Sequence, residues 1–308
     1  MGHLTQNLNG VTDLIESPTA VRHRGSHSGV MIITGAVATT IVGASVPVTG
    51  LLDGYPVLSG QAVRYAIGGV ALLAWALITR QRVPLPSGRD LVALALLAAT
   101  GMLGFSACVL AAQRHAEPGF VAAVVGASPL VLALVGPLTT GRRPRVRVVA
   151  GAVLVVAGVV TLSGGGTWGW AGLGLAALAL VGEALFTLLA VRPVARIGAL
   201  GVSTWACFVA AAEGAVVATV TEGAAAWRVP DATEALALVV LGVIVTAVAY
   251  ICWYSCVSRV GADRAGVLVG LMPVSGVLAS LALGAQSLSL LALAGALVVA
   301  VGCALGLG

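Results

Sequence analysis

The chain has 308 residues, of which 59% are hydrophobic and only 9% are charged. A soluble domain carries about a quarter charged residues because its surface faces water, so this composition excludes a soluble globular protein. The net charge of +5 does not indicate nucleic-acid binding, because the Arg residues lie in short connectors between apolar segments, as membrane orientation requires. The segments are apolar on every face, which excludes the alternating pattern of a membrane β-barrel.

Residues 1–28 are polar and lack an apolar core, so they are predicted to form a disordered cytoplasmic tail. A regulatory or docking role is the alternative for this segment. After it, apolar segments of about 20 residues follow one another, and this is the length that crosses a hydrocarbon core. Ten of these segments predict an all-α integral membrane protein with ten transmembrane helices, at residues 30–51, 57–79, 90–112, 119–140, 147–163, 170–191, 199–220, 235–257, 265–284 and 288–307.

The Arg residues predict the orientation. Placing the N-terminus inside puts thirteen Arg on the cytoplasmic side, whereas Arg114 and Arg228 fall outside and Arg64 falls within a helix. Positively charged connectors stay inside. We therefore expect both termini to be cytoplasmic and the protein to lie in the cell membrane.

An internal repeat divides the chain. Small residues and one proline recur 144 residues apart with no gap, and they pair Ala122 with Gly266, Gly126 with Gly270, Pro129 with Pro273, Gly151 with Gly295, and Gly158 with Gly302. A proline inside an apolar segment is rarely matched by chance in this register. The repeat predicts two five-helix halves, residues 29–166 and 167–308, which meet near SGGGTWGW.

An odd number of helices per half inverts the second copy. The connector at 142–147 carries four Arg, whereas the matching connector GAQSLSLL has no charge, as expected if the two lie on opposite sides. Inverted repeats are a recurrent plan of secondary transporters, in which one half rocks against the other to give alternating access.

The chain resembles the EamA-type transporters of the drug/metabolite transporter superfamily. The resemblance covers residues 30–307 and rests on AEPGFVAAVVGASPLVLAL with GAVLVVAGVV, on GADRAGVLVGLMPVSGVLASLALG with GALVVAVG, and on LSGQAVRYAIGGVALL, which places Arg64 where the family's second helix carries an Arg. It implies an exporter of a small metabolite or drug-like solute that is coupled to an ion gradient. The family's Gly-Glu pair after the fourth and ninth helices is absent here, where Thr140-Gly141-Arg142 and Gly284-Ala285-Gln286 stand, and this departure leaves the substrate open.

Three charged residues lie inside apolar segments: Arg64, Glu183 and Glu213. A charge at the bilayer centre costs about 2.5–3.5 kcal/mol on insertion scales, so such residues usually face a cavity or a partner. Our hypothesis is that Glu183 is a proton- or cation-linked binding residue, with Arg64 as its counter-charge or as a contact for a substrate anion. Glu213 is a further candidate. A structural ion pair or a snorkelling Arg is the alternative reading.

Pro129 and Pro273 interrupt the fourth and ninth helices, because proline lacks the amide hydrogen and clashes with the carbonyl four residues earlier. Paired interruptions indicate a binding site at midplane; a packing kink is the alternative. The small residues Gly126, Gly151, Gly158, Gly266, Gly270, Gly295 and Gly302 predict close helix packing, with dimerisation through the stripe as the alternative.

Gln113, Tyr250, Trp253 and Tyr254 lie on the third and eighth helices. Aromatic residues with a polar tip suit a substrate pocket or an interfacial belt, and the place of Trp253 and Tyr254 near a helix end favours the belt.

No arrangement of residues indicates an enzyme, a cofactor or a metal site. The five Cys lie inside apolar segments, and Cys252 and Cys256 share a helix face without a third ligand nearby. We expect a small-molecule substrate, a lipid bilayer and no nucleic acid as partners, with a homodimer left open. A membrane-embedded enzyme, a non-transporting membrane component and a lipid scramblase are the alternatives to a transporter.

Overall fold

The computed structural model describes residues 18–164, 166–284 and 289–308, with the side chains described from residue 29 onward, and in this part of the chain every regular element is helical. Within these described ranges ten helices are long and apolar enough to cross a membrane, which confirms the predicted fold class. Several of them consist of consecutive elements. In the first half they are α2 (Pro18–Ala44) with α3 (Val46–Gly50), α4 (Val57–Ile78), α5 (Gly88–Leu97) with η1 (Ala98–Gly104) and α6 (Phe105–Ala112), α7 (Pro118–Val125) with α8 (Ser128–Val135) and η2 (Pro137–Thr140), and α9 (Val146–Ser163).

The second half has the same order. Its elements are α10 (Trp170–Leu188), α11 (Val191–Glu222) with η3 (Gly223–Trp227), α12 (Ala232–Val240) with η4 (Leu241–Val248) and α13 (Ala249–Val260), α14 (Ala262–Val267) with η5 (Leu268–Gly270) and α15 (Leu271–Ala282), and α16 (Leu290–Leu307). Most bounds agree with the apolar segments to within a few residues.

Two helices extend beyond their predicted bounds. α2 begins at Pro18 and therefore includes the polar segment 18–28. Proline is tolerated in the first turn of a helix, where Pro18 stands. The rest of the expected disordered tail, 1–17, lies outside the described residues. α11 begins at Val191 because helix continues on both sides of Gly198, whose positive φ of 75° breaks the direction of the chain there.

The two halves share local detail that continues the 144-residue register. Ser87 and Asp90 form a capping box at the start of α5, and Asp231 and Glu234 form one at the start of α12. Each helix then runs into a π-helical segment, η1 or η4, at the same position of the repeat. The repeat therefore reproduces helix starts and helix irregularities as well as small residues.

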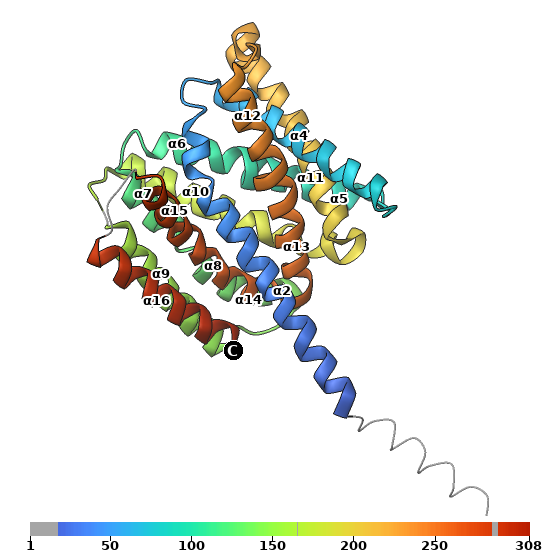
Figure 1. Ribbon diagram of the computed structural model, residues 1–308, viewed down its shortest axis with the longest axis vertical. Coiled ribbons are helices and arrows are strands. Elements are labelled where there is room, and N and C mark those ends of the chain that lie inside the picture. The colour runs from blue at the N-terminus through green and yellow to red at the C-terminus, as the bar shows by residue number, and fades with distance from the viewer. Residues whose placement is uncertain (1–17, 165, 285–288) are drawn as a thin grey trace, which may run out of the picture.

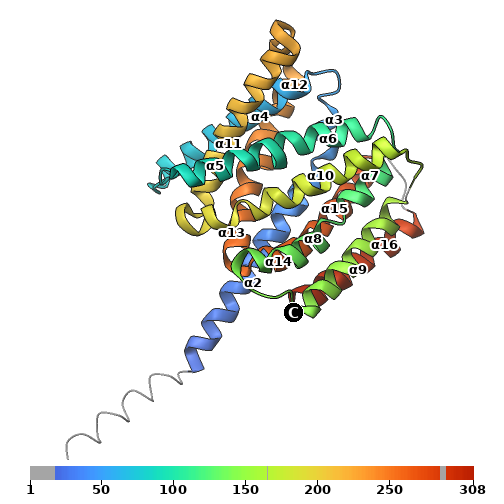
Figure 2. The ribbon, with the colours of Figure 1, turned by 180° about the vertical axis from the view of Figure 1, so that it is seen from behind.

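α9 and α16 show that the second half is inverted. They run antiparallel side by side (Figure 2), and a Cβ added to Gly302 would lie 2.8 Å from the Gly151 carbonyl oxygen. A Cβ added to Gly295 would lie 2.7 Å from the Gly158 carbonyl oxygen. When each glycine is replaced by its equivalent in the other half, the contact between Gly151 and Gly302 becomes the contact between Gly295 and Gly158. The structure therefore confirms two inverted five-helix repeats.

The remaining helices form the body of the molecule. α4 packs against α11, and α2 packs against α13 and α15, while α10 packs against η1, α6 and α7. Figure 1 shows the α9–α16 pair along one edge and the α4–α11 pair away from it. The largest apolar core lies between these pairs and includes Leu94, Met102, Trp253 and Tyr254.

The two ends of the bundle differ in charge. We call one end of the bundle the Arg-rich end; it carries the connectors before α5, α9, α11 and α14. This end holds the ion pairs between Arg196 and Asp90 and between Arg142 and Asp263. The opposite end holds the ion pair between Arg228 and Glu234, and this hydrogen-bonded carboxylate raises the pKa of Arg228. Among the described residues every ion pair lies near an end, so none neutralises the charges in the middle of the helices.

Candidate substrate site

A cluster of aromatic side chains lies where helices of the two halves meet. Phe186 of α10 has its ring centroid 5.0 Å from that of Tyr250 and 5.3 Å from that of Tyr254, both on α13. Tyr65 of α4 lies beside Tyr250. We call Tyr65, Phe186, Tyr250 and Tyr254 the aromatic cluster; three of its members carry hydroxyl groups that can donate and accept hydrogen bonds.

Arg64 lies at one side of the aromatic cluster. Its Nε donates a hydrogen bond to the Thr246 hydroxyl at 2.9 Å, and its guanidinium carbon lies 5.5 Å from the centroid of the Tyr65 ring. No carboxylate of the described chain lies within ion-pair distance of Arg64. The guanidinium is thus positioned by a neutral hydroxyl and an aromatic face, and its positive charge stays available to an anionic group.

Thr246 reaches Arg64 from η4. This segment is π-helical, and such insertions in a helix shift the side chains that follow and occur frequently at functional sites. The glycines on both sides permit the close approach of α4 to η4, because a Cβ on Gly68 would lie 2.8 Å from the Thr246 methyl carbon and one on Gly242 would lie 3.0 Å from the Arg64 carbonyl oxygen.

Glu183 lies on α10, on the side of the aromatic cluster where Tyr254 is its neighbour. It is half-buried and forms no ion pair with any described residue. The expected role of Arg64 as counter-charge to Glu183 is therefore wrong, and the alternative of a structural ion pair between the two is not formed either. Arg64 and Glu183 instead lie on different sides of the aromatic cluster.

The prediction that Trp253 and Tyr254 belong to an interfacial belt is wrong. Both are buried, with Tyr254 fully inaccessible, because α13 continues to Val260 and packs these rings against α10. The Tyr254 hydroxyl donates to the Phe186 carbonyl at 3.2 Å, and the Trp253 indole donates to the Thr187 hydroxyl at 3.2 Å. Their polar tips thus find partners within the protein, as buried Tyr and Trp normally do.

Sequence reasoning missed Gln61 and Tyr65. Gln61 lies three residues before Arg64, on the same face of α4, and its Oε1 atom is buried without a hydrogen-bond partner. A buried acceptor without a protein partner is costly, so this oxygen is available to accept a hydrogen bond from a bound solute. The sequence feature that could have revealed Gln61 is its amide side chain in an otherwise apolar segment, one helical turn from the charge of Arg64.

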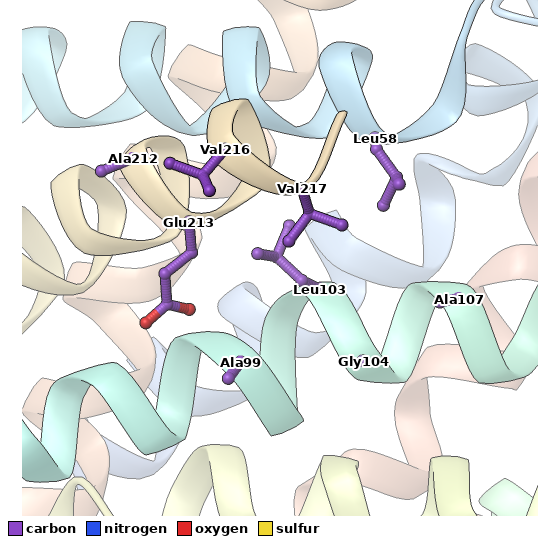
Figure 3. A pocket seen from close by; sticks show the side chains of 9 residues that line it. All are labelled: Leu58, Ala99, Leu103, Gly104, Ala107, Ala212, Glu213, Val216 and Val217. Atoms are coloured by element: carbon purple, nitrogen blue, oxygen red, sulfur yellow. The ribbon is translucent and has the colours of Figure 1, made fainter. Parts of the chain in front are cut away.

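Glu213 lies apart from the aromatic cluster. It lines a pocket of about 610 Å³ between α4, the η1–α6 helix and α11 (Figure 3), and the other lining residues are apolar or glycine: Leu58, Ala99, Leu103, Gly104, Ala107, Ala212, Val216 and Val217. Both halves contribute to this pocket, but it lacks the several polar groups expected of a transport site at midplane. Gln113 is also separate, since it is exposed at the end of α6.

The two proline interruptions lie at equivalent positions. The fourth helix breaks at Gly126 and Ala127 before Pro129, and the ninth changes to the short 3-10 segment η5 before Pro273. Near the first break the Leu130 amide bonds to the Ala127 carbonyl at 3.0 Å, three residues back instead of four. The Ser128 hydroxyl beside this break is buried without a partner.

Gly126, Gly266 and Gly270 lie at helix contacts. A Cβ on Gly266 would lie 2.6 Å from Leu132 Cβ, one on Gly270 would overlap a Val155 methyl carbon, and one on Gly126 would overlap Val159. Together with the α9–α16 contacts, these positions leave no room for a side chain. The glycine stripe on α9 and α16 faces the other half of the same chain, so it is not free to contact a second copy.

Within the described residues no group of three or more His, Cys, Asp or Glu side chains is placed to hold a metal ion. The arrangement brings together a cation, hydroxyls and aromatic faces, with a carboxylate nearby. These groups can bind a small polar solute, but they contain no paired nucleophile and base.

Comparison with known proteins matches both halves to one family. The EamA-like transporter family matches residues 29–164 and, a second time, residues 170–307. The chain belongs to the EamA-like transporter family. This confirms the resemblance seen in the motifs, and the two matches leave residues 165–169 between them.

Relatives of this EamA-like protein carry transporter names. The uncharacterized transporter YetK of Bacillus subtilis (strain 168) is 27% identical over 253 residues, which cover 80% of this chain and 77% of YetK. The uncharacterized transporter YdeK of the same organism is 33% identical over 140 residues, or 44% of this chain and 48% of YdeK. A solved crystal structure aligns with a TM-score of 0.75 and 23% identity over 90% of this chain and 96% of its own, and this likeness concerns the fold alone.

Proposed function

We propose that this EamA-like protein is a secondary transporter that moves a small metabolite or drug-like solute by alternating access, outward across the cell membrane. The observation that carries the proposal is the placement of Arg64 and Glu183 beside a buried aromatic cluster at the junction of the two halves, with no ion-pair partner for either in the described chain. Charges inside a membrane are expensive unless they serve a pathway or a partner.

The difference between the two ends of the fourth and ninth helices supports alternating access. At the Arg-rich end α8 packs on α14, where all but one of six residues are buried. Beyond the breaks, Ser275 is the one buried residue among the twelve of α15. The more loosely packed part of each helix therefore lies beyond the paired interruptions, which is where a transporter of inverted repeats is expected to flex.

The proposed direction of transport rests on the family resemblance. By the positive-inside rule we propose that the Arg-rich end, and with it both termini, lies in the cytoplasm, so the tightly packed end would face the cell interior. Export and coupling to an ion gradient are what the family resemblance implies, and coupling to protons is part of our proposal. Glu183 is the residue proposed to carry the proton, because it is a carboxyl group inside the bundle without a cationic partner.

Reconstitution in liposomes tests the proposal. Labelled metabolites and drug-like compounds would be screened for flux with and without a pH gradient, and we expect at least one compound to move faster with the gradient. The Glu183→Gln variant should lose the dependence on the gradient, because an amide cannot release a proton. The matched control is Glu222→Gln, which changes an exposed Glu at the end of α11.

Two results would contradict the proposal. A full screen without flux, from protein that is correctly folded in the liposomes, would remove the transport function. Wild-type flux with an unchanged pH profile in Glu183→Gln would remove proton coupling through Glu183 but leave transport in place.

A further inference from the structure

The pocket that Glu213 lines has the size and surface of a binding site for an amphipathic molecule. Its volume of about 610 Å³ lies within the range of about 300–1,000 Å³ that is typical of small-molecule sites. Leu103 forms a buried wall, whereas Val216 and Val217 are 64% and 42% exposed at the rim. In a membrane this rim faces lipid, so the pocket is accessible from the hydrocarbon core.

Glu213 is the single charged residue among those that line the pocket. Figure 3 shows its carboxylate in the space between α11 and the η1 helix, near Ala99. Its Oε2 atom is buried without a hydrogen-bond partner, and no described Arg forms an ion pair with it. A carboxylate in this position lacks the donor or cation that buried acids normally have.

Short side chains create the space around this carboxylate. Ala99, Gly104, Ala107 and Ala212 stand where larger residues would close the gap between α11 and the third helix. Ala99 and Gly104 belong to the π-helical segment η1, a type of insertion that is frequent at functional sites.

We propose that this pocket binds an amphipathic amine that enters from the bilayer, with the ammonium paired to Glu213 and the apolar body against Leu58, Leu103 and the rim valines. The apolar walls select a hydrophobic body, and the unpartnered carboxylate selects a positively charged hydrogen-bond donor. The site is separate from the aromatic cluster around Arg64 and does not depend on transport.

The depth of Glu213 favours a solute over a lipid headgroup. Glu213 lies nine positions before the end of α11 at Glu222, which corresponds to about 14 Å along a helix. The ammonium of a phosphatidylethanolamine would have to leave the headgroup region to reach it. A small amine with a flexible apolar body has no such constraint.

Binding to the purified protein in phosphatidylcholine nanodiscs tests the proposal without any transport measurement. The probe is a dansyl group joined by a short alkyl chain to a primary ammonium, and its partner compound carries a hydroxyl in place of the ammonium. We expect the wild-type protein to bind the amine about tenfold or more tightly than the alcohol, since a charge-assisted hydrogen bond is worth at least one decade in affinity. The Glu213→Gln variant should bind both compounds equally.

Two further variants separate a binding role from a structural one. Glu222→Gln, on the same helix but outside the pocket, should bind like the wild type. Ala99→Leu should weaken both compounds, because it fills the space beside the carboxylate at an exposed position that tolerates a larger side chain. Thermal unfolding in the same nanodiscs shows whether each variant is folded.

Equal binding of amine and alcohol to the wild-type protein would overturn the proposal, as would unchanged selectivity in Glu213→Gln. Loss of amine binding when phosphatidylethanolamine replaces part of the phosphatidylcholine would assign the pocket to a lipid headgroup and overturn the assignment to a solute.

Discussion

Arg64 is held by a neutral hydroxyl through its Nε atom and lies over an aromatic ring, an arrangement that depends on the planar guanidinium. Lys keeps the charge but has neither the Nε donor nor the flat face. We therefore expect Arg64→Lys to lower the rate of transport about tenfold, since one hydrogen bond to a charged group is worth about 1.5 kcal/mol or more. Arg64→Gln should lower it further.

Initial rates in liposomes, with a solute identified by the screen, measure this effect. Arg114→Gln is the matched control, because Arg114 is exposed in a connector. A rate in Arg64→Lys equal to that of the wild type would show that charge alone suffices and that the position of the guanidinium does not matter.

At this scale the sequence predicted which residues are unusual but not their neighbours. Arg64, Glu183 and Glu213 stand out because they are charged within apolar segments. The pairing of Arg64 with Thr246 was not predictable, because it depends on the phase of a π-helical segment. The burial of Trp253 and Tyr254 was missed because nearness to a helix end was taken as nearness to the membrane surface.

The contact between α9 and α16 makes a prediction about a single methyl group. A Cβ at Gly158 would lie 2.7 Å from the Val299 amide nitrogen and 2.8 Å from the Gly295 carbonyl oxygen, and both are backbone atoms that cannot rotate away. Gly158→Ala should therefore force the helices apart and lower the free energy of unfolding by about 1–3 kcal/mol, the usual cost of overpacking. Thermal unfolding in detergent measures it.

Gly174→Ala provides the comparison for this element. Gly174 lies in α10 with open space around it, so Ala there should be neutral or stabilise the helix by up to about 1 kcal/mol through its higher helix propensity. Equal effects of the two substitutions would show that the α9–α16 contact is looser than the structure describes.

The helices themselves were largely predictable, and their irregularities were not. Length and hydropathy placed all ten spans, because crossing a bilayer imposes a minimum apolar length. The segments η1 and η4 carry no residue pattern that distinguishes i→i+5 from i→i+4 bonding, so they were missed. The breaks near Pro129 and Pro273 were predictable because proline removes a specific hydrogen bond.

For the whole molecule, the inverted repeat predicts where equivalent residues are accessible. Arg145 is the N-cap of α9, and Ser289 is the N-cap of α16 at the equivalent position. In a background in which Cys108, Cys207, Cys252, Cys256 and Cys303 are replaced, Arg145→Cys and Ser289→Cys should react with a membrane-impermeant thiol reagent from opposite sides of the membrane. Reaction from the same side would exclude the inverted arrangement.

Alternating access requires the Arg-rich end to open, and a disulfide tests this movement. A Cβ added to Gly136 would lie 3.4 Å from Ala262 Cβ, close to the separation of about 3.5–4.5 Å found in disulfides. In the same cysteine-free background, Gly136→Cys with Ala262→Cys should cross-link on oxidation and stop transport, and a reductant should restore it.

Gly136→Ala and the two single Cys variants measure any cost of the added side chains. Transport at the wild-type rate by the cross-linked protein would show that this end need not open.

The architecture could be predicted more completely than the candidate site, because the two depend on different information. The repeat and the alternation of charged connectors follow from composition along the chain, and they survive any exchange of one apolar residue for another. In lipid the outer surface of a helix is as apolar as its packed face, so hydropathy does not indicate which face is buried. The positions of Gln61, Tyr65 and the pocket of Glu213 depend on that missing information.

The glycine contact between α9 and α16 has a consequence for how such a molecule can be assembled. Gly151 meets Gly302 and Gly158 meets Gly295, so each half offers the other the same pair of notches in reverse order. A surface of this kind is self-complementary and needs no covalent link to be satisfied. Two separate copies of one half, inserted in opposite senses, would present the same pair of notches to each other, so the shape of this surface does not itself require the two halves to be joined.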